Sequence, residues 1–363
     1  MICLGESKYI YHFYIIPVQN RQKIMKTYLL IDTNNSFVRA FHGNRGPMSD
    51  WDRIGMTLNI VLCQLALAVD KLKPDHVIFF TEGKSWRSSI YPTYKNARKL
   101  KRAKSTPEEQ AAMNGLFEAI GDFTEFVTTR TNATVLHAPN CEADDLIARW
   151  TQKHPNDINI IFSNDSDFNQ LLSNSVYILH PTHNYLLTIA GAYTTDGMPY
   201  TEKNIPNVDP KYELFYKCVR GDSSDSIMAA YPGVREKGTK NKIGILQAYA
   251  DMEQKGYDWQ NFMLTEILIP GTDEITTVAE RYTLNEQLID LTKQPPYIIK
   301  EMDDLIDSVP TKQISSIGMH FIRFANNYQI NNIRDNPMYY LNIFTKSYIS
   351  DRSSYGSEKQ TGN

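Results

Sequence analysis

The stretch PNCEADDLIARW, residues 139–150, places three carboxylates within four positions and then becomes apolar. Glu142, Asp144 and Asp145 repel one another, so their clustering is unfavourable unless a positive charge lies beside them. Acidic residues in the first turn of a helix also interact favourably with the helix dipole, which offers a purely structural explanation. The motif alone does not decide between that role and the binding of a cation.

Two further acidic motifs are equally ambiguous when each is taken alone. SNDSDFNQ, residues 163–170, alternates oxygen-bearing side chains like a calcium loop. However, Gln170 stands where such a loop requires Gly, and no Glu occupies its twelfth position. GDSSDS, residues 221–226, spaces two aspartates three apart and is also explained as a turn with a helix cap.

Together the acidic residues indicate a metal site. If they converge, they can coexist only around cations, because unpaired like charges would raise each other's pKa values. Oxygen ligands without His or Cys favour Mg²⁺ or Mn²⁺ over zinc. The predicted metal ligands are Asp32, Glu82, Glu142, Asp144, Asp145, Asp165, Asp167, Asp222 and Asp225.

A basic segment lies close to these motifs along the chain. Residues 84–104, KSWRSSIYPTYKNARKLKRAK, contain eight Lys or Arg and no acid. If Pro92 opens a helix, Lys95 and Arg98 recur on one face together with Arg102, and nearby tyrosines offer stacking surfaces for bases. A solvated basic helix is the structural alternative. The predicted nucleic-acid contacts in this segment, besides Lys95 and Arg98, are Arg87, Tyr91, Tyr94 and Arg102.

A second basic motif, YPGVREKGTKNKIGIL at residues 231–246, is typical of a helix-hairpin-helix turn. Such a turn presents backbone N–H groups to a duplex phosphate without reading the bases. An ordinary glycine-rich connection between helices would explain the same residues. The predicted phosphate contacts are Gly233, Gly238 and Lys240.

The elements that must position these residues alternate between strands and helices, which predicts an α/β fold with a largely parallel sheet. Strands are predicted over 26–32, 76–82, 134–137 and 158–163, then at SVYIL and YLLTI; helices are predicted over 55–71, from Thr106 with a capping box, and from about 141. Asp32, Glu82 and Asp165 lie at or just past strand ends, along the edge where open α/β sheets bind ligands.

Composition sets wider bounds. The chain has 363 residues, 42% of them hydrophobic, which suffices for one large domain or two ordinary ones. Without the nine carboxylates, the 38 basic residues outnumber the remaining 32 acidic ones, giving a basic body around an acidic site. Four scattered cysteines without a CxxC pair favour a reduced, cytoplasmic setting.

The two ends of the chain differ from the rest. Residues 1–24 include the apolar run YIYHFYIIPV, which is too short to span a bilayer and lacks a signal-peptide cleavage site. Because Met25 followed by KTYLLIDTNN reads as a start, we predict that 1–24 is a non-native or disordered extension. The predicted domains are an α/β core over 25–205, a helical DNA-binding domain over 206–345 and a disordered tail over 346–363.

Taken in order, the motifs resemble the 5′-nuclease (flap endonuclease) superfamily. The likeness is carried by LLIDTNNSFVRAFHG, YPTYKNAR, EADD, SNDSDFNQL and GDSSDSI followed by PGVREKG, over roughly residues 28–246. NEQLID, residues 285–290, extends it to the T-even-type phage ribonuclease H. The resemblance implies a PIN-like 5′-nuclease core and a mainly helical C-terminal domain with the hairpin motif.

The resemblance also implies roles at matching positions. An inner metal ion would be bound by Asp32, Glu142, Asp144, Asp165 and Asp167, and an outer one by Asp145, Asp222 and Asp225. Pairing Glu142 with Asp144 requires a helix that begins between them. Lys95 and Arg98 resemble the arch residues that reach the scissile phosphate.

Two departures from the family pattern affect these assignments. Glu82 stands where the family usually has Asp, so its assignment as a ligand is weaker. Glu236-Lys237-Gly238 replaces the usual Gly-Ile-Gly of the hairpin. An acid there should weaken phosphate binding. The sequence does not decide whether this hairpin has the monovalent-cation site often found in the family.

We interpret the chain as a metal-dependent 5′→3′ exonuclease or flap endonuclease, in which two Mg²⁺ or Mn²⁺ ions would activate a water and stabilise the leaving oxygen. Its implied partners are DNA and RNA–DNA duplexes with 5′ ends or flaps, and a phage single-strand-binding protein. It would act as a monomer in phage replication, removing primers in the host cytoplasm and away from membranes. The alternatives are a metal-dead DNA-binding protein, which the intact acid set disfavours, and an unrelated phosphohydrolase, which the basic motifs disfavour.

Overall fold

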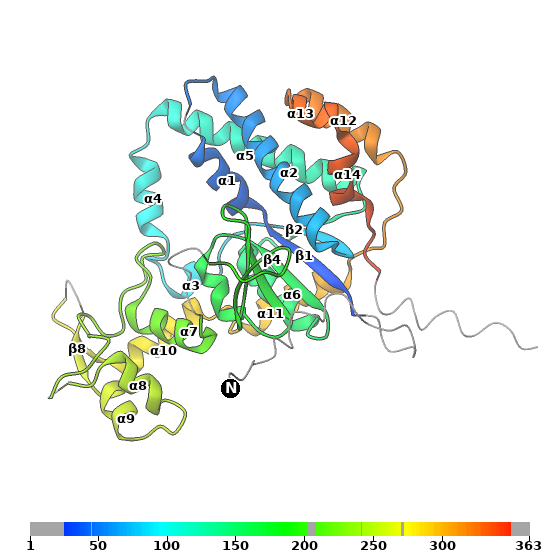
Figure 1. Ribbon diagram of the computed structural model, residues 1–363. Helices are drawn as coiled ribbons and strands as arrows, with labels where there is room; N and C mark the ends of the chain where they lie inside the picture. The colour runs from blue at the N-terminus through cyan, green and yellow to red at the C-terminus, as the bar shows by residue number, and fades with distance from the viewer. Residues whose placement is uncertain (1–24, 45, 202–207, 241, 270–271, 350–363) are drawn as a thin grey trace, which may run out of the picture.

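The structure is a computed structural model that describes residues 25–349 except 45, 202–207, 241 and 270–271. The predictions for residues 1–24 and for 350–363 of the tail lie outside the described residues. Within the described part, an α/β core carries a smaller, mainly helical lobe that projects from one end (Figure 1).

The centre of the core is a seven-stranded sheet in the order β3-β2-β1-β4-β5-β6-β7. Its strands are β1 (Thr27–Asp32), β2 (His76–Thr81), β3 (Thr134–His137), β4 (Ile158–Phe162), β5 (Val176–His180), β6 (Tyr185–Thr188) and β7 (Gly191–Thr194). The strands from β3 to β5 pair in parallel, and β6 and β7 add antiparallel at one edge. This confirms the predicted α/β fold. Strand order reverses between β1 and β4, and the carboxyl ends of strands at such a point are where open α/β sheets bind ligands.

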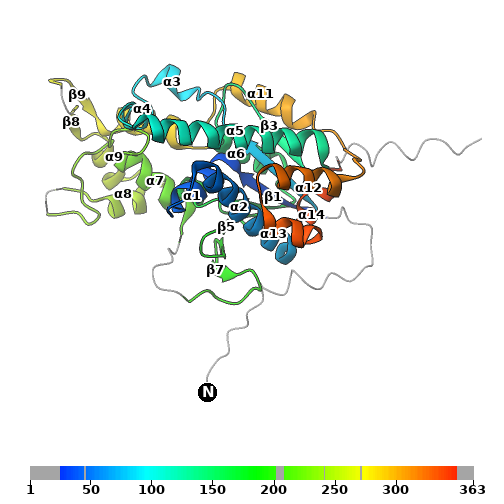
Figure 2. The same ribbon diagram turned by 90° about the horizontal axis from the view of Figure 1, so that it is seen from above.

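Helices cover both faces of this sheet, each over a separate apolar core. One face carries α1 (Thr33–Gly43), α2 (Asp50–Leu72), α5 (Pro107–Arg130), α12 (Ile317–Asn327), α13 (Asn331–Asp335) and α14 (Pro337–Thr345). The other carries α6 (Ala143–Lys153) and α11 (Pro296–Asp307). Figures 1 and 2 show the two layers from perpendicular directions. A parallel sheet covered on both faces explains why its central strands are continuously apolar.

The helical lobe is smaller than the predicted 206–345 domain. It contains α7 (Pro210–Arg220), α8 (Ile245–Asp251), α9 (Tyr257–Met263), the hairpin of β8 (Glu266–Leu268) and β9 (Ile275–Thr277), and α10 (Val278–Ile289). The helices α11–α14 return to the α/β core, where Phe321, Phe324 and Phe344 pack against Phe126 of α5. The apolar faces of these helices therefore complete the core of the first domain.

Among the described residues, α2 alone is long and apolar enough to cross a membrane by length and composition. More than half of its most apolar window, 56%, is buried inside the protein. Leu58, Leu62 and Leu65 are fully buried in the core shared with the sheet. Packing in the core accounts for the composition of this helix.

The basic segment folds differently from the prediction in one respect. Two helices form there, α3 (Arg87–Ile90) and α4 (Asn96–Ala103). Pro92 does not open a helix, because it lies in a turn closed by the N–H of Tyr94 on the carbonyl of Tyr91, 2.9 Å apart. Lys95 has a left-handed backbone with φ 56° and caps α4 instead. Arg98 therefore shares a face of α4 with Arg102, but Lys95 precedes the helix.

Candidate metal centre and nucleic-acid interface

Asp32 lies at the point where strand order reverses, between the end of β1 and the start of α1. Its carboxylate accepts the N–H of Asn35 at 3.3 Å and the hydroxyl of Ser163 at 3.0 Å. Burial, followed by the charges of Glu82 and Asp165, raises the pKa of Asp32 to about 7. Carboxylates from three strand ends thus affect one another at this edge, as the strand pattern predicted.

The acidic motif of residues 142–145 lies at the start of α6. The helix begins at Ala143, between Glu142 and Asp144, which confirms the condition for pairing these two carboxylates. Oxygens of Glu142, Asp144 and Asp145 lie within 4.8 Å of one another. Burial and then the charges of its two neighbours raise the pKa of Asp144 well above its usual range. A cation bound beside Asp144 would favour its ionised form.

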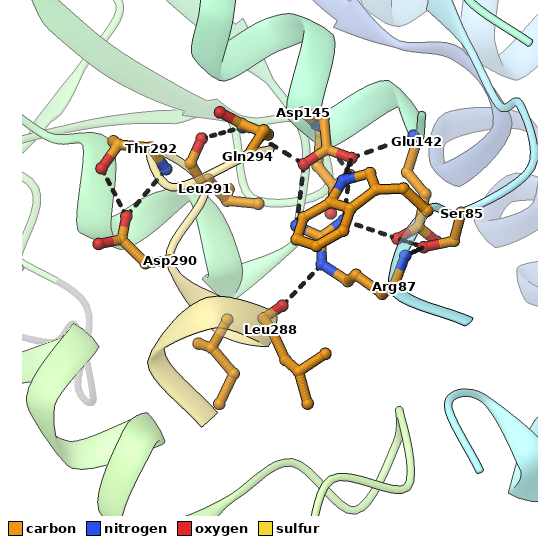
Figure 3. Close-up of polar contacts among 12 residues, drawn as sticks. Ser85, Arg87, Glu142, Asp145, Leu288, Asp290, Leu291, Thr292 and Gln294 are labelled. Carbon is orange, nitrogen blue, oxygen red and sulfur yellow. Dashed lines mark hydrogen bonds and ion pairs between the residues drawn. The ribbon is translucent and has the colours of Figure 1, made fainter. Parts of the chain in front are cut away.

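Asp145 is already neutralised within the protein (Figure 3). Its Oδ1 accepts from Arg87 Nη2 at 2.8 Å and from Gln294 at 3.3 Å. Its Oδ2 accepts from Arg87 Nη1 at 2.9 Å, from the indole of Trp86 at 3.1 Å and from the N–H of Glu142 at 3.2 Å. Five donors satisfy the lone pairs of this fully buried carboxylate, so in this geometry Asp145 holds Arg87 rather than facing a metal.

Arg87 and Tyr94 were predicted to contact nucleic acid, and the structure corrects both assignments. Arg87 is 1% exposed and Tyr94 is 3% exposed. Arg87 also contacts Glu142 at 3.0 Å, and the Tyr94 hydroxyl lies 2.8 Å from Glu142 and 3.0 Å from Asp225. Carboxylates draw these donors inward, because a buried charge requires a partner. Both side chains therefore shape the acidic site and cannot reach a substrate.

Glu142 joins the buried network to the open part of the site. Its Oε2 accepts from Ser85 at 2.8 Å, and its Oε1 pairs with the ammonium group of Lys95. Although burial acts to raise it, the charges of Lys95 and Arg87 lower the pKa of Glu142 overall. Lys95 thus lies at the acidic site, and its role at a scissile phosphate stays a prediction.

Asp165, Asp167 and Asp222 line a cavity of about 390 Å³ between η2 (Ser166–Leu171) and the loop after α7. Asp165 accepts the N–H of Asp167 at 3.0 Å, and Asp167 pairs with Lys217. Asp222 accepts the N–H of Ser224 at 2.7 Å and lines the same cavity. Lys217 was missed by sequence reasoning; its only signal is its position one helical turn before the GDSSDS motif.

The start of α4 docks on this loop. Arg98 contacts Asp225 at 2.6 Å, and the backbone N–H of Lys95 donates to the carbonyl of Asp225 at 2.8 Å. The N–H of Ala97 donates to Ser226 at 2.9 Å. The predicted pair Lys95 and Arg98 is therefore placed beside the carboxylates, while Arg102 lies farther along α4 and is exposed.

Glu82 follows β2, and its side chain reaches toward α6. Its carboxylate accepts the N–H of Ala143 at 3.3 Å, one of the N-terminal amides that a helix leaves without a partner inside the helix. A carboxylate at this position is also favoured by the helix dipole. Glu82 therefore joins the acidic group, and its role as a metal ligand stays a prediction.

The donor set fits a hard divalent cation. Nine carboxylates lie along one edge of the sheet and the adjoining loop, compensated by Arg87, Lys95, Arg98 and Lys217. Acids thus outnumber the neighbouring cations, and burial together with like charges raises the pKa values of Asp32 and Asp144. All donors are oxygens, which suits Mg²⁺ or Mn²⁺.

Residues 27–200 match the family described as 5′-3′ exonuclease, N-terminal resolvase-like domain. The match to this family covers just under half of the chain. DNA polymerase I of Mycobacterium tuberculosis is 30% identical over 229 residues, which are 61% of this chain and 23% of the polymerase. The thermostable DNA polymerase I of Thermus aquaticus is 26% identical over 232 residues, 62% and 24% of the two chains. The chain therefore spans about a quarter of these relatives.

Solved structures give the same fold. A bacteriophage T5 flap endonuclease in a pseudo-enzyme-product complex with DNA and metal ions aligns with a TM-score of 0.52 and 18% identity, covering 83% of this chain and 97% of the phage chain. The T5 protein crystallised with metal ions gives a TM-score of 0.51, with 83% and 98% covered. At this identity the likeness concerns the fold, and it confirms the predicted 5′-nuclease architecture.

Residues 27–200, which match the exonuclease family, supply seven of the nine carboxylates, and Asp222 and Asp225 come from the loop after α7. The hairpin motif follows that loop. Gly233, with φ +71°, follows Pro232 in a turn closed by Val234 and Tyr231, a combination that favours glycine. At Gly238 a Cβ would lie 2.6 Å from the backbone carbonyl oxygen of Lys242, which favours glycine there.

The phosphate contacts of Gly233 and Gly238 stay predictions. The N–H groups of Ile245 and Leu246 donate to the carbonyls of Arg235 and Glu236, each at 3.0 Å. These two N–H groups therefore already have hydrogen-bond acceptors within the hairpin motif. Lys240 is exposed, so its contact with phosphate stays a prediction that rests on its charge.

Proposed function

We propose that the protein is a divalent-metal-dependent 5′→3′ exonuclease or flap endonuclease that hydrolyses phosphodiesters at 5′ ends of DNA or of RNA primers on DNA. The observation that best supports this is the joining of carboxylates from three strand ends to the loop of Asp222 and Asp225, with Lys95 and Arg98 at the junction. An acidic site next to exposed cations suits a polyanionic substrate. The cations would bind its phosphates, and the acidic site would cut it.

The residues have separate tasks in this proposal. Asp32, Glu142, Asp144, Asp165 and Asp167 would hold one ion, and Asp222 and Asp225 a second, with Glu82 near the first. The bound metals supply an activated water and stabilisation of the leaving oxygen. Lys95 and Arg98 meet the charge that develops on the scissile phosphate. Exposed cations of α4 and of the hairpin, including Arg102 and Lys240, follow the backbone, and half-buried Tyr91 borders the same surface.

The relatives support the substrate class. The T5 flap endonuclease structure contains DNA and metal ions, and the polymerase relatives act on DNA by name. We further propose that the protein acts as a monomer in phage replication, removing primers in the host cytoplasm beside a single-strand-binding protein.

The test is cleavage of a 5′-labelled flap, a nicked duplex and an RNA–DNA hybrid, with Mg²⁺ and with EDTA. We expect metal-dependent cleavage of at least one of the three. The double variant Asp165→Asn, Asp167→Asn keeps shape but removes two ligand charges; cleavage should fall roughly a thousandfold, with DNA affinity in Ca²⁺ retained. Asp303→Asn, which removes a carboxylate paired with Arg149 rather than with the acidic site, is the control. A double variant that cuts at the normal rate would refute the metal centre.

A further inference from the structure

Residues 285–294, here called the strap, include the NEQLID motif that the proposed function leaves without a role. The strap forms the last part of α10 and the turn that leads to α11. Its principal side chains are buried: Asn285 is 0% exposed, Leu288 2%, and Asp290 and Gln294 5% each. It lies beyond residues 27–200 that match the exonuclease family. Its contacts reach three of the five segments that carry the carboxylates, namely α6, η2 and the loop after α7.

Asn285 holds the loop of Asp222 and Asp225. Both hydrogens of its amide are used, one donated to the carbonyl of Cys218 and one to that of Met228, each at 2.8 Å. These carbonyls lie on either side of the acidic loop, so one side chain joins the two ends of the loop to α10. Because its partners are backbone carbonyls, Asn285 fixes the loop without adding charge beside the acids.

The end of α10 holds the α6 carboxylates through Arg87 (Figure 3). The Nε of Arg87 donates to the carbonyl of Leu288 at 2.6 Å, while its other nitrogens bind Asp145 and Glu142. The last carbonyls of a helix lack partners within the helix, and the dipole there favours a cation. Gln294 reaches Asp145 from the other end of the strap, at 3.3 Å.

Gln170 holds the third segment, η2, which carries Asp167. Its amide donates to the carbonyl of Ile289 at 3.1 Å and accepts the N–H of Leu291 at 2.9 Å. This two-way bond explains a glutamine at the position where a calcium loop would need glycine. The strap thus contacts η2, α6 and the loop after α7 within ten residues.

We propose that the strap is a positioning element that sets the spacing of α6, η2 and the loop after α7, with Asn285 as its principal residue. Like charges drive these segments apart, and metals can bind them together only if the donors are already close. Neutral amides and a helix terminus oppose that repulsion without competing with the metals for the carboxylates. The proposal rests on the metal site of the proposed function.

The test compares Asn285→Ala and Gln170→Ala with a matched control. Asn132→Ala removes an amide that donates to the carbonyl of Thr345 at 2.8 Å and so also ties together segments that are distant in the sequence. Asn132 lies just before β3, at the amino end of that strand, whereas the acidic site lies at the carboxyl ends of the strands. Divalent-metal affinity is measured by the rise in melting temperature on titration with Mn²⁺, since a ligand of the folded state stabilises it by an amount that grows with the logarithm of its affinity. The Mg²⁺ dependence of single-turnover cleavage gives an independent readout.

We expect Asn285→Ala to weaken metal affinity about 10- to 100-fold, as is typical for residues that orient metal ligands, and to raise the Mg²⁺ needed for half-maximal cleavage. Gln170→Ala, at a half-buried and more tolerant position, should show the same change to a smaller extent and remains measurable if Asn285→Ala does not fold. Asn132→Ala should lower the melting temperature but keep wild-type metal affinity. If both strap variants bind divalent metal with wild-type affinity, or if the control loses as much affinity as they do, the proposed role of the strap is wrong and the proposed function stands. A wild-type protein that binds no divalent ion overturns the proposed function as well.

Discussion

The basic segment divides at Lys95 into two parts with different surroundings. In residues 85–95, the root of the arch, Arg87 and Tyr94 turn inward and contact Glu142, Asp145 or Asp225. In α4, every residue is exposed. The root therefore completes the acidic site, whereas the helix presents its cations to solvent, where they can meet a phosphate backbone.

This difference shows that one run of basic residues can serve two purposes. A cation within reach of a buried carboxylate lowers the cost of burying both charges, and it is then unavailable to a ligand. A cation that stands on an exposed helix remains available but contributes little to stability. Arg98 lies at the boundary, half exposed and paired with Asp225. Substitutions before Lys95 should therefore lower stability and cleavage, whereas substitutions in α4 should mainly weaken DNA binding.

The largest effect is expected at Arg87. Arg87→Met removes one partner of a buried ion pair and leaves Asp145 without compensation, which costs roughly 3–5 kcal/mol of unfolding free energy. Cleavage should be lost with it, because Glu142 also loses a donor. Urea denaturation measures the first effect and flap cleavage the second.

The control for Arg87 is the same substitution on the helix. Arg102→Met should change the unfolding free energy by no more than about 0.5 kcal/mol, as is usual for exposed positions. If Arg87→Met is as mild as Arg102→Met, the root is not the buried framework described above.

A smaller loss, confined to the rate, is expected at Lys95. Lys95→Ala should slow single-turnover cleavage by about two orders of magnitude, because a preorganised cation beside the scissile phosphate is removed. DNA affinity measured in Ca²⁺ should change little, since the exposed cations of α4 remain. Extra Mg²⁺ should not restore the rate, which distinguishes this effect from loss of a metal ligand. Equal losses of rate and affinity would place Lys95 with the helix rather than with the site.

The two parts also differ in what the sequence could predict. Strands were predictable from apolar runs, the start of α5 from the capping box of Thr106 and Glu109, and the acidic edge from carboxylates at strand ends. The inward orientation of Arg87 and Tyr94 could not be predicted, because their partners lie up to 131 residues away in the chain. The return of α11–α14 to the core was missed for the same reason, since an apolar helical face does not specify which surface it covers.

The smallest effect should come from the exposed helix. Lys99→Ala combined with Arg102→Ala removes two cations that are exposed on α4. DNA binding should weaken uniformly across sequences, and the slope of log affinity against log salt should become less steep by about one for each phosphate that is no longer neutralised. The cleavage rate at saturating DNA should stay within about twofold of wild type, since neither residue is placed near the acidic site and surface substitutions have small effects. A matched pair on another surface, Lys71→Ala with Lys73→Ala, should leave the slope unchanged. A double α4 variant that keeps the wild-type salt slope but cuts more slowly at saturation would reverse the division at Lys95, because α4 would then act on the reaction rather than on binding.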